Sequence, residues 1–428
     1  ENVHFGSSIY SFDGGITTIT ATTDSDSTSG VDDENIEVAV TTEFVAAGAA
    51  IKFVGGKIDL ANDANLTITS GNGPIEVSGV AGVSDETVTI DAGTSSVKIG
   101  DVGDSSHAEI HNLTISGDAG ITLTGSIYTS ADSSSAGDVT FNDKVIIDGA
   151  VSIDTDDTGD TTSTDGRIIF TTSIQSETNG TDSLTLTSGA GTITLVEIGG
   201  SSKPLTSFVA TTNALTISND ITTTGLSDIN APVTLGADVI ISSGTGTGNV
   251  EFSSTIAGTQ NLDILSGSGA VTITGNIGGG GALTSLDINA TGASTGTGNI
   301  NILGNIGADG TSGAGIVNIG NSNTGTITLG TSGTESEYFT TGAQTYDAAT
   351  YSLVGTDPDF NASSENIDFQ DGDNGMTLAA GADLTVDTGS GEDGNINIEA
   401  AIASTGGETT DVTLEAGSGT VVVYGMAT

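Results

Sequence analysis

The stretch that decides the fold runs from Asn261 to Leu286 and reads NLDILSGSGAVTITGNIGGGGALTSL. Its apolar residues, such as Leu262 and Ile264, recur at every second position, so each run places them on one face of a strand. A Gly-Ser-Gly turn separates the two runs and supplies the permissive backbone that a tight corner requires. The stretch therefore predicts two short strands joined by a corner.

The same phrase occurs at least four times in the chain. The other copies are NLTISGDAGITLTGSI from Asn112, SLTLTSGAGTITLVEIGG from Ser183 and DVTLEAGSGTVVV from Asp411. Alternating segments precede three of the copies by a similar interval, which predicts a longer unit of three strands, a turn and two further strands. A strand of this length is not stable alone, but stacked rungs about 4.8 Å apart pair their backbones and build one continuous core.

We therefore predict an all-β fold, a right-handed parallel β-helix (β-solenoid) of short strands, because parallel crossovers favour that hand. A β-sandwich array is the alternative, since short strands with frequent turns also fit it. Corner asparagines, such as Asn249, Asn276 and Asn299, are expected to adopt left-handed geometry or to form ladders with neighbouring rungs.

Four segments are expected along the chain. Residues 1–55 form N-terminal strands and an acidic loop, residues 56–334 the solenoid repeats, residues 335–375 an aromatic-rich modified repeat with an insertion, and residues 376–428 a final repeat that ends open. The aromatic segment has two interpretations, a locally thicker core or a subunit-contact patch formed by Tyr338, Tyr346 and Tyr351. The final copy stops where the others continue, so we predict subunit contacts at Val421, Val422, Val423 and Tyr424, unless the chain is a fragment.

The formal charge is −49, from 55 acidic and 6 basic residues, and no Lys, Arg or His follows Lys203. Such a surface repels phosphates and anionic headgroups, so we expect no nucleic-acid partner. No apolar run is long enough for a membrane span. The absence of cysteine excludes disulfides and thiolate chemistry and fits either a secreted or a cytosolic protein. The start at Glu1, without a methionine, suggests a processed terminus or an excised fragment, and we expect a secreted, extracellular or cell-surface location.

Acidic corners are the candidate calcium sites, although no cofactor is required by the sequence. One cluster contains Asp154, Asp156, Asp157 and Asp160, and another contains Asp24, Asp26, Asp32 and Asp33. Asp371 and Asp373 lie in DGDNG, which resembles the start of a calcium loop but has Ala382 where a bidentate Glu belongs. A solvated loop is the alternative for each cluster.

His107, Glu109 and His111 alternate along one predicted strand, where two imidazoles and a carboxylate could ligate zinc. Ile110 would then point to the core, which leaves the trio facing solvent. An exposed polar face without metal is the alternative interpretation.

Three phrases resemble a known group of proteins: IGG followed by LTSL (Ile277 to Leu286), TTGAQTY (Thr340 to Tyr346) and GNINI (Gly298 to Ile302). They look like the β-strand-repeat large exoproteins, similar to filamentous-haemagglutinin-type adhesins and cell-surface structural proteins. The resemblance implies a right-handed β-helix, secretion, and a role in adhesion or surface structure. The secretion-domain signature that is usual at the start of such adhesins is not evident.

The resulting hypothesis is a non-catalytic extracellular structural protein that self-assembles through open solenoid ends into a fibre, sheath or surface layer. An adhesin stalk or passenger domain, with cell-surface glycans or a neighbouring surface as partner, is the alternative. A polysaccharide-active β-helix enzyme is less supported. Lyase chemistry needs a basic residue, and the few that exist are scattered, while paired carboxylates are easily found among 55 acidic residues.

Overall fold

The computed structural model describes residues 3–12, 14–21, 35–83, 85–103, 110–129, 137–156, 165–200, 202–290, 296–307, 313–389, 394–406 and 410–426. Among them there is no helix, and parallel strands form stacked coils, a β-solenoid of about 15 turns. This confirms the predicted fold class over the sandwich alternative. The chain divides into two compact units, Glu1–Leu215 and Thr216–Thr428, and the division falls within β23 (Ala214–Ile217).

Each coil of unit 1 passes through three strand columns, called faces A, B and C. Face A contains β1 (Val3–Phe5), β4 (Ile36–Val38), β7 (Ile58–Leu60), β14 (Ile127–Tyr128), β17 (Ala150–Asp154), β20 (Ser183–Thr187) and β22 (Ser207–Thr211). Face B contains β2 (Ile9–Phe12), β5 (Thr42–Ala46), β8 (Leu66–Thr69), β10 (Thr87–Asp91), β12 (Asn112–Ser116), β15 (Val139–Phe141), β18 (Ile168–Phe170) and β21 (Thr192–Leu195). Face C contains β3 (Thr17–Thr20), β6 (Ile51–Val54), β13 (Gly120–Leu123), β16 (Val145–Ile147) and β19 (Ile174–Ser176), while β9 (Ile75–Ala81) and β11 (Ser96–Val102) run from face C into face A.

Unit 2 has three columns of its own, called faces P, Q and R. Face P contains β24 (Ile221–Thr222), β27 (Val239–Ser242), β30 (Asn261–Leu265), β32 (Leu283–Ile288), β34 (Ala314–Gly320), β37 (Gln344–Ala348), β40 (Ile367–Asp371) and the first halves of β43 (Ile396–Ser404) and β45 (Val421–Met426). Face Q contains β25 (Ser227–Asn230), β28 (Val250–Phe252), β31 (Val271–Ile273), β33 (Ile300–Ile302), β35 (Thr326–Leu329), β38 (Thr350–Leu353) and β41 (Met376–Leu378). Face R contains β26 (Val233–Leu235), β29 (Ile256–Ala257), β36 (Ser336–Thr340), β39 (Pro358–Ala362), β42 (Leu384–Asp387) and β44 (Val412–Glu415).

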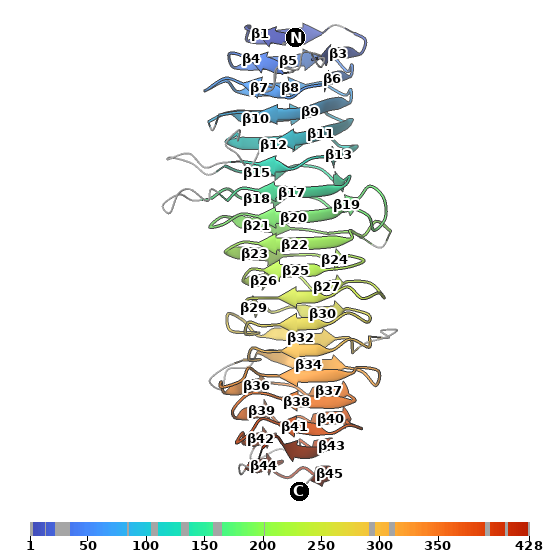
Figure 1. Cartoon of the computed structure of the whole chain (residues 1–428), viewed down its shortest axis with the longest axis vertical. Helices are drawn as coiled ribbons and strands as arrows, with labels where there is room; N and C mark the ends of the chain where they lie inside the picture. The colour runs from blue at the N-terminus through green and yellow to red at the C-terminus, as the bar shows by residue number, and fades with distance from the viewer. Residues whose placement is uncertain are drawn as a thin grey trace. The chain divides into compact units, whose positions relative to one another are not determined.

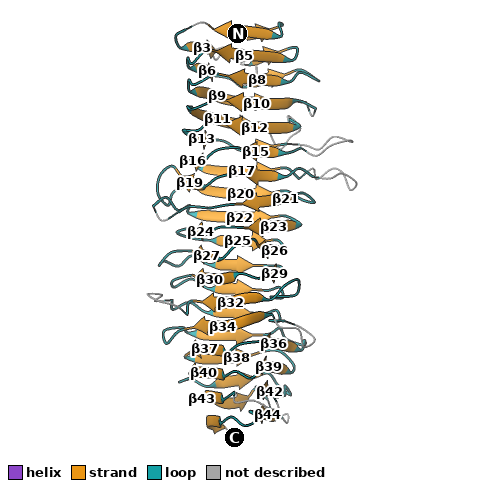
Figure 2. Ribbon diagram, turned by 180° about the vertical axis from the view of Figure 1, so that it is seen from behind, coloured by secondary structure: helices purple, strands orange, loops and turns teal. Residues whose placement is uncertain are grey.

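The alternation read from the sequence produces the core of each unit. In unit 1, Leu113 and Ile115 of β12 are fully buried while Thr114 between them points outward, and β8, β10 and β12 repeat this pattern one below another (Figure 1). In unit 2, β30, β32, β34, β37 and β40 follow one another in the same way (Figure 2). Each rung thus buries a thin layer of aliphatic side chains between its neighbours.

The repeated phrases do not begin on one face. In unit 1 the copy from Asn112 begins on face B with β12, whereas the copy from Ser183 begins on face A with β20. In unit 2 the copy from Asn261 begins on face P and the copy from Asp411 on face R. Each copy therefore encodes two strands and a corner that fit more than one face. The longer unit of strands predicted from their spacing is wrong, since a coil has three strands.

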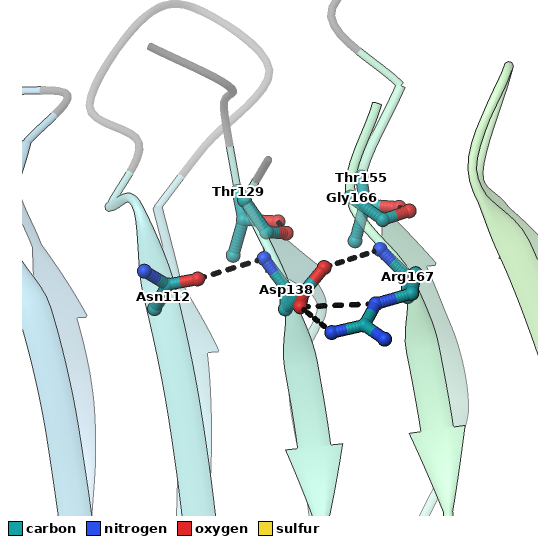
Figure 3. A network of polar contacts seen from close by, with 7 residues as sticks. Asn112, Thr129, Asp138, Thr155, Gly166 and Arg167 are labelled. Carbon is teal, nitrogen blue, oxygen red and sulfur yellow. Dashed lines mark hydrogen bonds and ion pairs between the residues drawn. The ribbon is translucent and has the colours of Figure 1, made fainter. Parts of the chain in front are cut away.

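Corner side chains hold successive coils in register. In unit 1 the backbone N–H of Asp138 donates to Asn112 Oδ1 (2.9 Å), and the backbone N–H of Arg167 donates to Asp138 Oδ1 (2.8 Å) (Figure 3). In unit 2 the predicted ladders are confirmed, because Oδ1 of Asn249, Asn276 and Asn299 accepts from Ala270 N, Asn305 N and Thr326 N. At each of these corners, the side-chain oxygen of an Asn or Asp thus accepts a hydrogen bond from a backbone N–H of the next coil.

A second corner device is a buried hydroxyl that closes the turn. Thr129 Oγ1 donates to the carbonyl of Gly137 (2.6 Å), and Thr155 Oγ1 donates to the carbonyl of Gly166 (2.7 Å). Figure 3 shows Thr129 and Thr155 at equivalent places on neighbouring coils. The glycine is required because a Cβ on Gly166 would lie 2.0 Å from the carbonyl oxygen of Gly137. Other such pairs are Thr223–Gly225, Ser243–Gly248, Ser266–Gly269, Thr340–Gly342 and Thr388–Gly394. We call each pair a hydroxyl–glycine clamp.

Candidate functional surfaces

The outward sides of the three faces of unit 2 differ in charge. Face P carries Asp263, Asp287, Asp347, Asp368 and Glu399, and face R carries Glu337, Asp359, Asp387 and Glu415. Face Q carries Asp228 and Glu251 near its start, whereas its later strands present Thr, Ser and Asn. Two faces of this unit are therefore acidic and one is largely uncharged.

Stacking places carboxylates of face P against one another. Asp263 and Asp287 occupy the same register position on β30 and β32, and the Asn318 amide donates to Asp287 Oδ1 (2.7 Å). Burial raises the pKa of the Asp263 carboxyl, and the neighbouring Asp287 raises it further. Burial likewise raises the pKa of Asp347, with the charges of Asp371 and Glu399 adding to the rise. Protonation of these carboxyls, or binding of cations to them, would reduce the electrostatic repulsion on face P.

In unit 1 several basic side chains pair with carboxylates of neighbouring coils, one or two coils away. Lys52 Nζ lies 2.6 Å from Glu76 Oε2, and Arg167 Nη2 lies 2.6 Å from Asp138 Oδ2. Lys98 reaches Asp148 at 3.6 Å. These side chains are about half exposed, so each pair contributes little to stability. In each pair the carboxylate locally neutralises the positive charge of its partner.

The first predicted calcium cluster lies partly within the described residues. Asp154 ends β17, and its Oδ1 accepts a hydrogen bond from the backbone N–H of Asp156 (3.0 Å). Burial raises the pKa of the Asp154 carboxyl, and the charges of Asp156 and Asp165 add to this effect. Asp157 and Asp160 lie outside the described residues, as does the whole cluster of Asp24, Asp26, Asp32 and Asp33.

The second predicted calcium site is a corner before β41. Asp371 has a left-handed backbone (φ 68°), its N–H donates to Glu399 Oε2 (3.3 Å), and Asp373 is exposed. Across the part of the chain that the structure describes, no group of three or more His, Asp or Glu side chains has a geometry that could hold a metal ion. Calcium at either cluster stays a prediction.

His107 and Glu109 lie outside the described residues, but His111 does not face solvent as predicted. It directly precedes β12, only 5% of its surface is exposed, and its backbone N–H donates to Glu86 O (2.8 Å). Ile110 is buried as expected. Two consecutive residues are therefore buried, because the chain turns a corner at this point instead of continuing as a strand.

The three aromatic residues proposed as contacts are core residues. Tyr338, Tyr346 and Tyr351 have no exposed surface, and their rings pack against Phe360 and Phe369. The Tyr346 hydroxyl donates to Gln344 Oε1 (3.0 Å), and the Tyr351 hydroxyl donates to the carbonyl of Tyr346 (2.8 Å). The thicker-core interpretation holds, and these side chains are not available to a partner in this fold.

The contacts predicted in the final coil, by contrast, are exposed. Val421 and Val422 are each 42% exposed, Tyr424 is 70% exposed, and Val423 is half exposed. Beside them is a hollow of about 510 Å³. Its lining is mostly aliphatic and consists of Ile402, Val412, Leu414, Val423 and Gly425. Apolar surface of this kind is stabilised by being covered.

A smaller hollow, of about 200 Å³, lies in unit 1 beside β19, and Gln175, Glu197 and Lys203 are among its lining residues. The Lys203 ammonium donates to the backbone carbonyl of Glu177. The hollow is polar but smaller than a typical small-molecule site. It offers a single cation, already engaged, and we assign it no chemistry.

One buried carboxylate was missed by sequence reasoning. Asp182 is 5% exposed and accepts hydrogen bonds from the backbone N–H groups of Gly149 (2.8 Å) and Thr178 (3.1 Å) and from the Ser176 hydroxyl. Burial opposes ionisation, but these hydrogen bonds outweigh it and lower the pKa of the carboxyl. Asp182 joins two coils. Its only sequence signal is its position directly before β20.

The fold defines the class as a parallel β-solenoid with hydrogen-bonded corners. Comparison with known proteins found no matching family model, no curated relative and no similar solved structure. No helix long and apolar enough to cross a membrane is found in the described residues.

Proposed function

We propose that this chain is a non-catalytic structural protein of the cell exterior that assembles end to end into a fibre, sheath or surface layer. One observation carries the proposal: the coil of β44 and β45 repeats the pattern of the coil before it, but its core side chains are only partly covered. Val421 stacks on Ile396, which is fully buried, and Leu414 stacks on Val386, which is also fully buried. A further coil would bury the equivalent residues here.

The first coil of unit 1 has surface of complementary chemistry. Phe5, Tyr10 and Phe12 are half exposed, and their rings pack on Phe44, which is fully buried in the next coil. Aromatic side chains at this coil could fill an aliphatic hollow of the size found beside β44 and β45. The strands β1 to β3 could then extend the parallel ladders of a second copy, which is a head-to-tail arrangement that grows without closing.

Composition supports an extracellular role. A net charge of −49 keeps single filaments apart at low salt and lets them approach when cations screen it. The phrases that resemble surface exoproteins lie in unit 2, which agrees with a structural role at a cell surface. Calcium, if it takes part, would act between acidic faces.

The test is electron microscopy and light scattering of the purified chain, with calcium and with a chelator. We expect filaments from the wild-type chain. Leu414→Glu places a charge in the apolar hollow and should leave single molecules, whereas Thr413→Glu adds the same charge on the outward side of β44 and should still assemble. Monodisperse particles from the wild-type chain in both solutions would contradict the proposal and favour a stalk.

A further inference from the structure

The outward strand residues of face Q carry no charge from β31 to β41. Thr272, Asn301, Thr328, Ser352 and Thr377 stack in direct register on successive coils, and each is half exposed. A second row, at the position directly after each strand, lies beside them and is aliphatic on three of the five coils, with Thr274 and Gly330 on the other two. It contains Leu303, Val354 and Ala379, also half exposed, each directly following a strand of this face. We call these two rows the neutral stripe.

The neutral stripe contrasts with the other two faces of the same unit. Face P repeats carboxylates on consecutive coils, as at Asp263 and Asp287, and face R does so at Glu337 and Asp359. Glu337 and Asp359 stack in register on face R, and the pKa of Asp359 is raised by burial and then by the charges of Glu337 and Asp387, as expected for carboxylates that repel one another within one molecule. A second copy brought against face P or face R would add to this repulsion.

We propose that the neutral stripe of unit 2 is the surface through which two copies of this chain pack side by side. The inference rests on the proposed self-assembly and adds its lateral contact. Unlike charges are scarce in this chain, with 6 basic residues against 55 acidic ones, so attraction between opposite charges cannot bring copies together. Charge repulsion is weakest where the neutral stripes face each other, and the threonine methyl groups and the aliphatic residues of the second row gain from losing water there.

The stripe is small, which determines how it acts. Five coils at about 4.8 Å spacing and a width of two outward positions, about 13 Å, give about 300 Å² for each partner, below what a stable dimer buries. A single pair of chains therefore associates weakly. Chains already joined end to end would repeat the contact many times, so the stripe should bundle filaments more than it pairs free chains.

Disulfide trapping suits so weak a contact, because the chain contains no cysteine. Thr328 lies at the centre of the stripe, so it meets itself in a parallel in-register pair and also in a two-fold symmetric antiparallel pair. The experiment compares Thr328→Cys with Thr345→Cys, a half-exposed position on face P, and with Thr385→Cys on face R. All three cysteine variants also carry Leu414→Glu, which blocks end-to-end growth. They are oxidised at moderate salt in a buffer that contains a chelator.

We expect the Thr328→Cys variant to form covalent dimers about tenfold faster than the two controls, because packing raises its effective concentration. Equal rates for the three variants would overturn the lateral contact. The oxidation is repeated with calcium in place of the chelator. If the Thr345→Cys variant on face P then dimerises fastest, the lateral contact would also be overturned, in favour of cation bridging between acidic faces.

The outcome is independent of the end-to-end proposal. If the wild-type chain forms no filaments but Thr328→Cys dimerises selectively, the proposed function fails and the neutral stripe stands. If filaments form but Thr328→Asp, in the otherwise wild-type chain, gives bundles as wide as those of Thr345→Asp, the neutral stripe fails and the end-to-end contact stands.

Discussion

The coils that contain β36 to β40 and the coil of β44 and β45 share one backbone pattern but have opposite interiors. In the first, Tyr338, Tyr346 and Phe369 have no exposed surface and stack ring on ring with their neighbours. In the second, Val421 and Val423 occupy core positions and remain partly exposed, although β45 pairs with β43 over most of its length, with a register shift after Ile398. The comparison teaches that hydrogen-bonded ladders fix the backbone of a coil from one side. Its core closes only when coils lie on both sides.

The largest expected effect is the loss of stability when a core side chain is truncated, which should differ between the two regions because only the enclosed one is left with a cavity. Phe369→Ala should lower the free energy of unfolding by about 3–5 kcal/mol, because its ring is enclosed by Tyr346, Tyr351 and Phe360. Val423→Ala, at an open core position, should cost about 1 kcal/mol or less. Urea unfolding followed by circular dichroism measures both. Equal losses would mean that the final coil is as well covered as the aromatic ones.

A finer comparison concerns the hydroxyl groups within the aromatic coils. Tyr346→Phe leaves Gln344 Oε1 without its donor, and Tyr351→Phe removes the donor to the carbonyl of Tyr346, so each should cost about 1–3 kcal/mol. The Tyr338 hydroxyl is buried and, within the described residues, has no hydrogen-bond partner of regular geometry, although Ser336 lies close to it.

Tyr338→Phe should therefore leave thermal stability unchanged or raise it slightly, since it removes a buried polar group that is not satisfied. The three single variants share one chemical change, so each is a control for the others. A loss at Tyr338 as large as at Tyr346 would show that its hydroxyl has a partner in solution.

The smallest expected effect is the response to pH around the aromatic coils. Burial raises the pKa of Asp347 and of Asp368 above the ordinary 3.8, and Glu399 adds to both rises. A carboxyl whose pKa is raised by folding binds its proton more tightly in the folded chain. Lowering the pH from 7 through the raised pKa values should therefore add stability, and the gain should level off below the ordinary pKa, where the unfolded chain is protonated too.

The melting temperature measured between pH 7 and pH 4 checks this dependence. Asp347→Asn should raise the melting temperature at pH 7 and flatten the profile, because it removes one of the repelling charges. Asp373→Asn removes the same charge from an exposed corner and is the control for net charge. A melting temperature that falls steadily on acidification from pH 7 would contradict the assignment.

The sequence was sufficient to predict the β-solenoid, because the alternation of residues such as Leu262 and Ile264 leaves little choice of face. It also predicted corner ladders, which Asn249, Asn276 and Asn299 all form. It could not assign strands to faces. The phrases from Asn112 and Ser183 are nearly alike but begin on different faces of unit 1, because each face makes the same demands on a strand.

Sites were harder to predict than the fold. Tyr346 is an ordinary aromatic residue in the sequence, and only its neighbours on adjacent coils, Phe360 and Phe369, reveal that it is core. His111 follows the expected alternation but lies at a corner. The neutral stripe consists of residues from five coils, so no local window of sequence contains it. The segment boundaries at residues 55, 334 and 375 stay predictions.

The hydroxyl–glycine clamps have a consequence for how such a chain changes over evolutionary time. The same bond closes a corner whether its two residues are 2 positions apart, as at Thr223 and Gly225, or 11 apart, as at Thr155 and Gly166. Residues gained or lost between the clamped ends leave the strands on either side where they were. Each clamp is therefore a place where new sequence can be tried at little risk to the fold, and a natural position for grafting a foreign peptide.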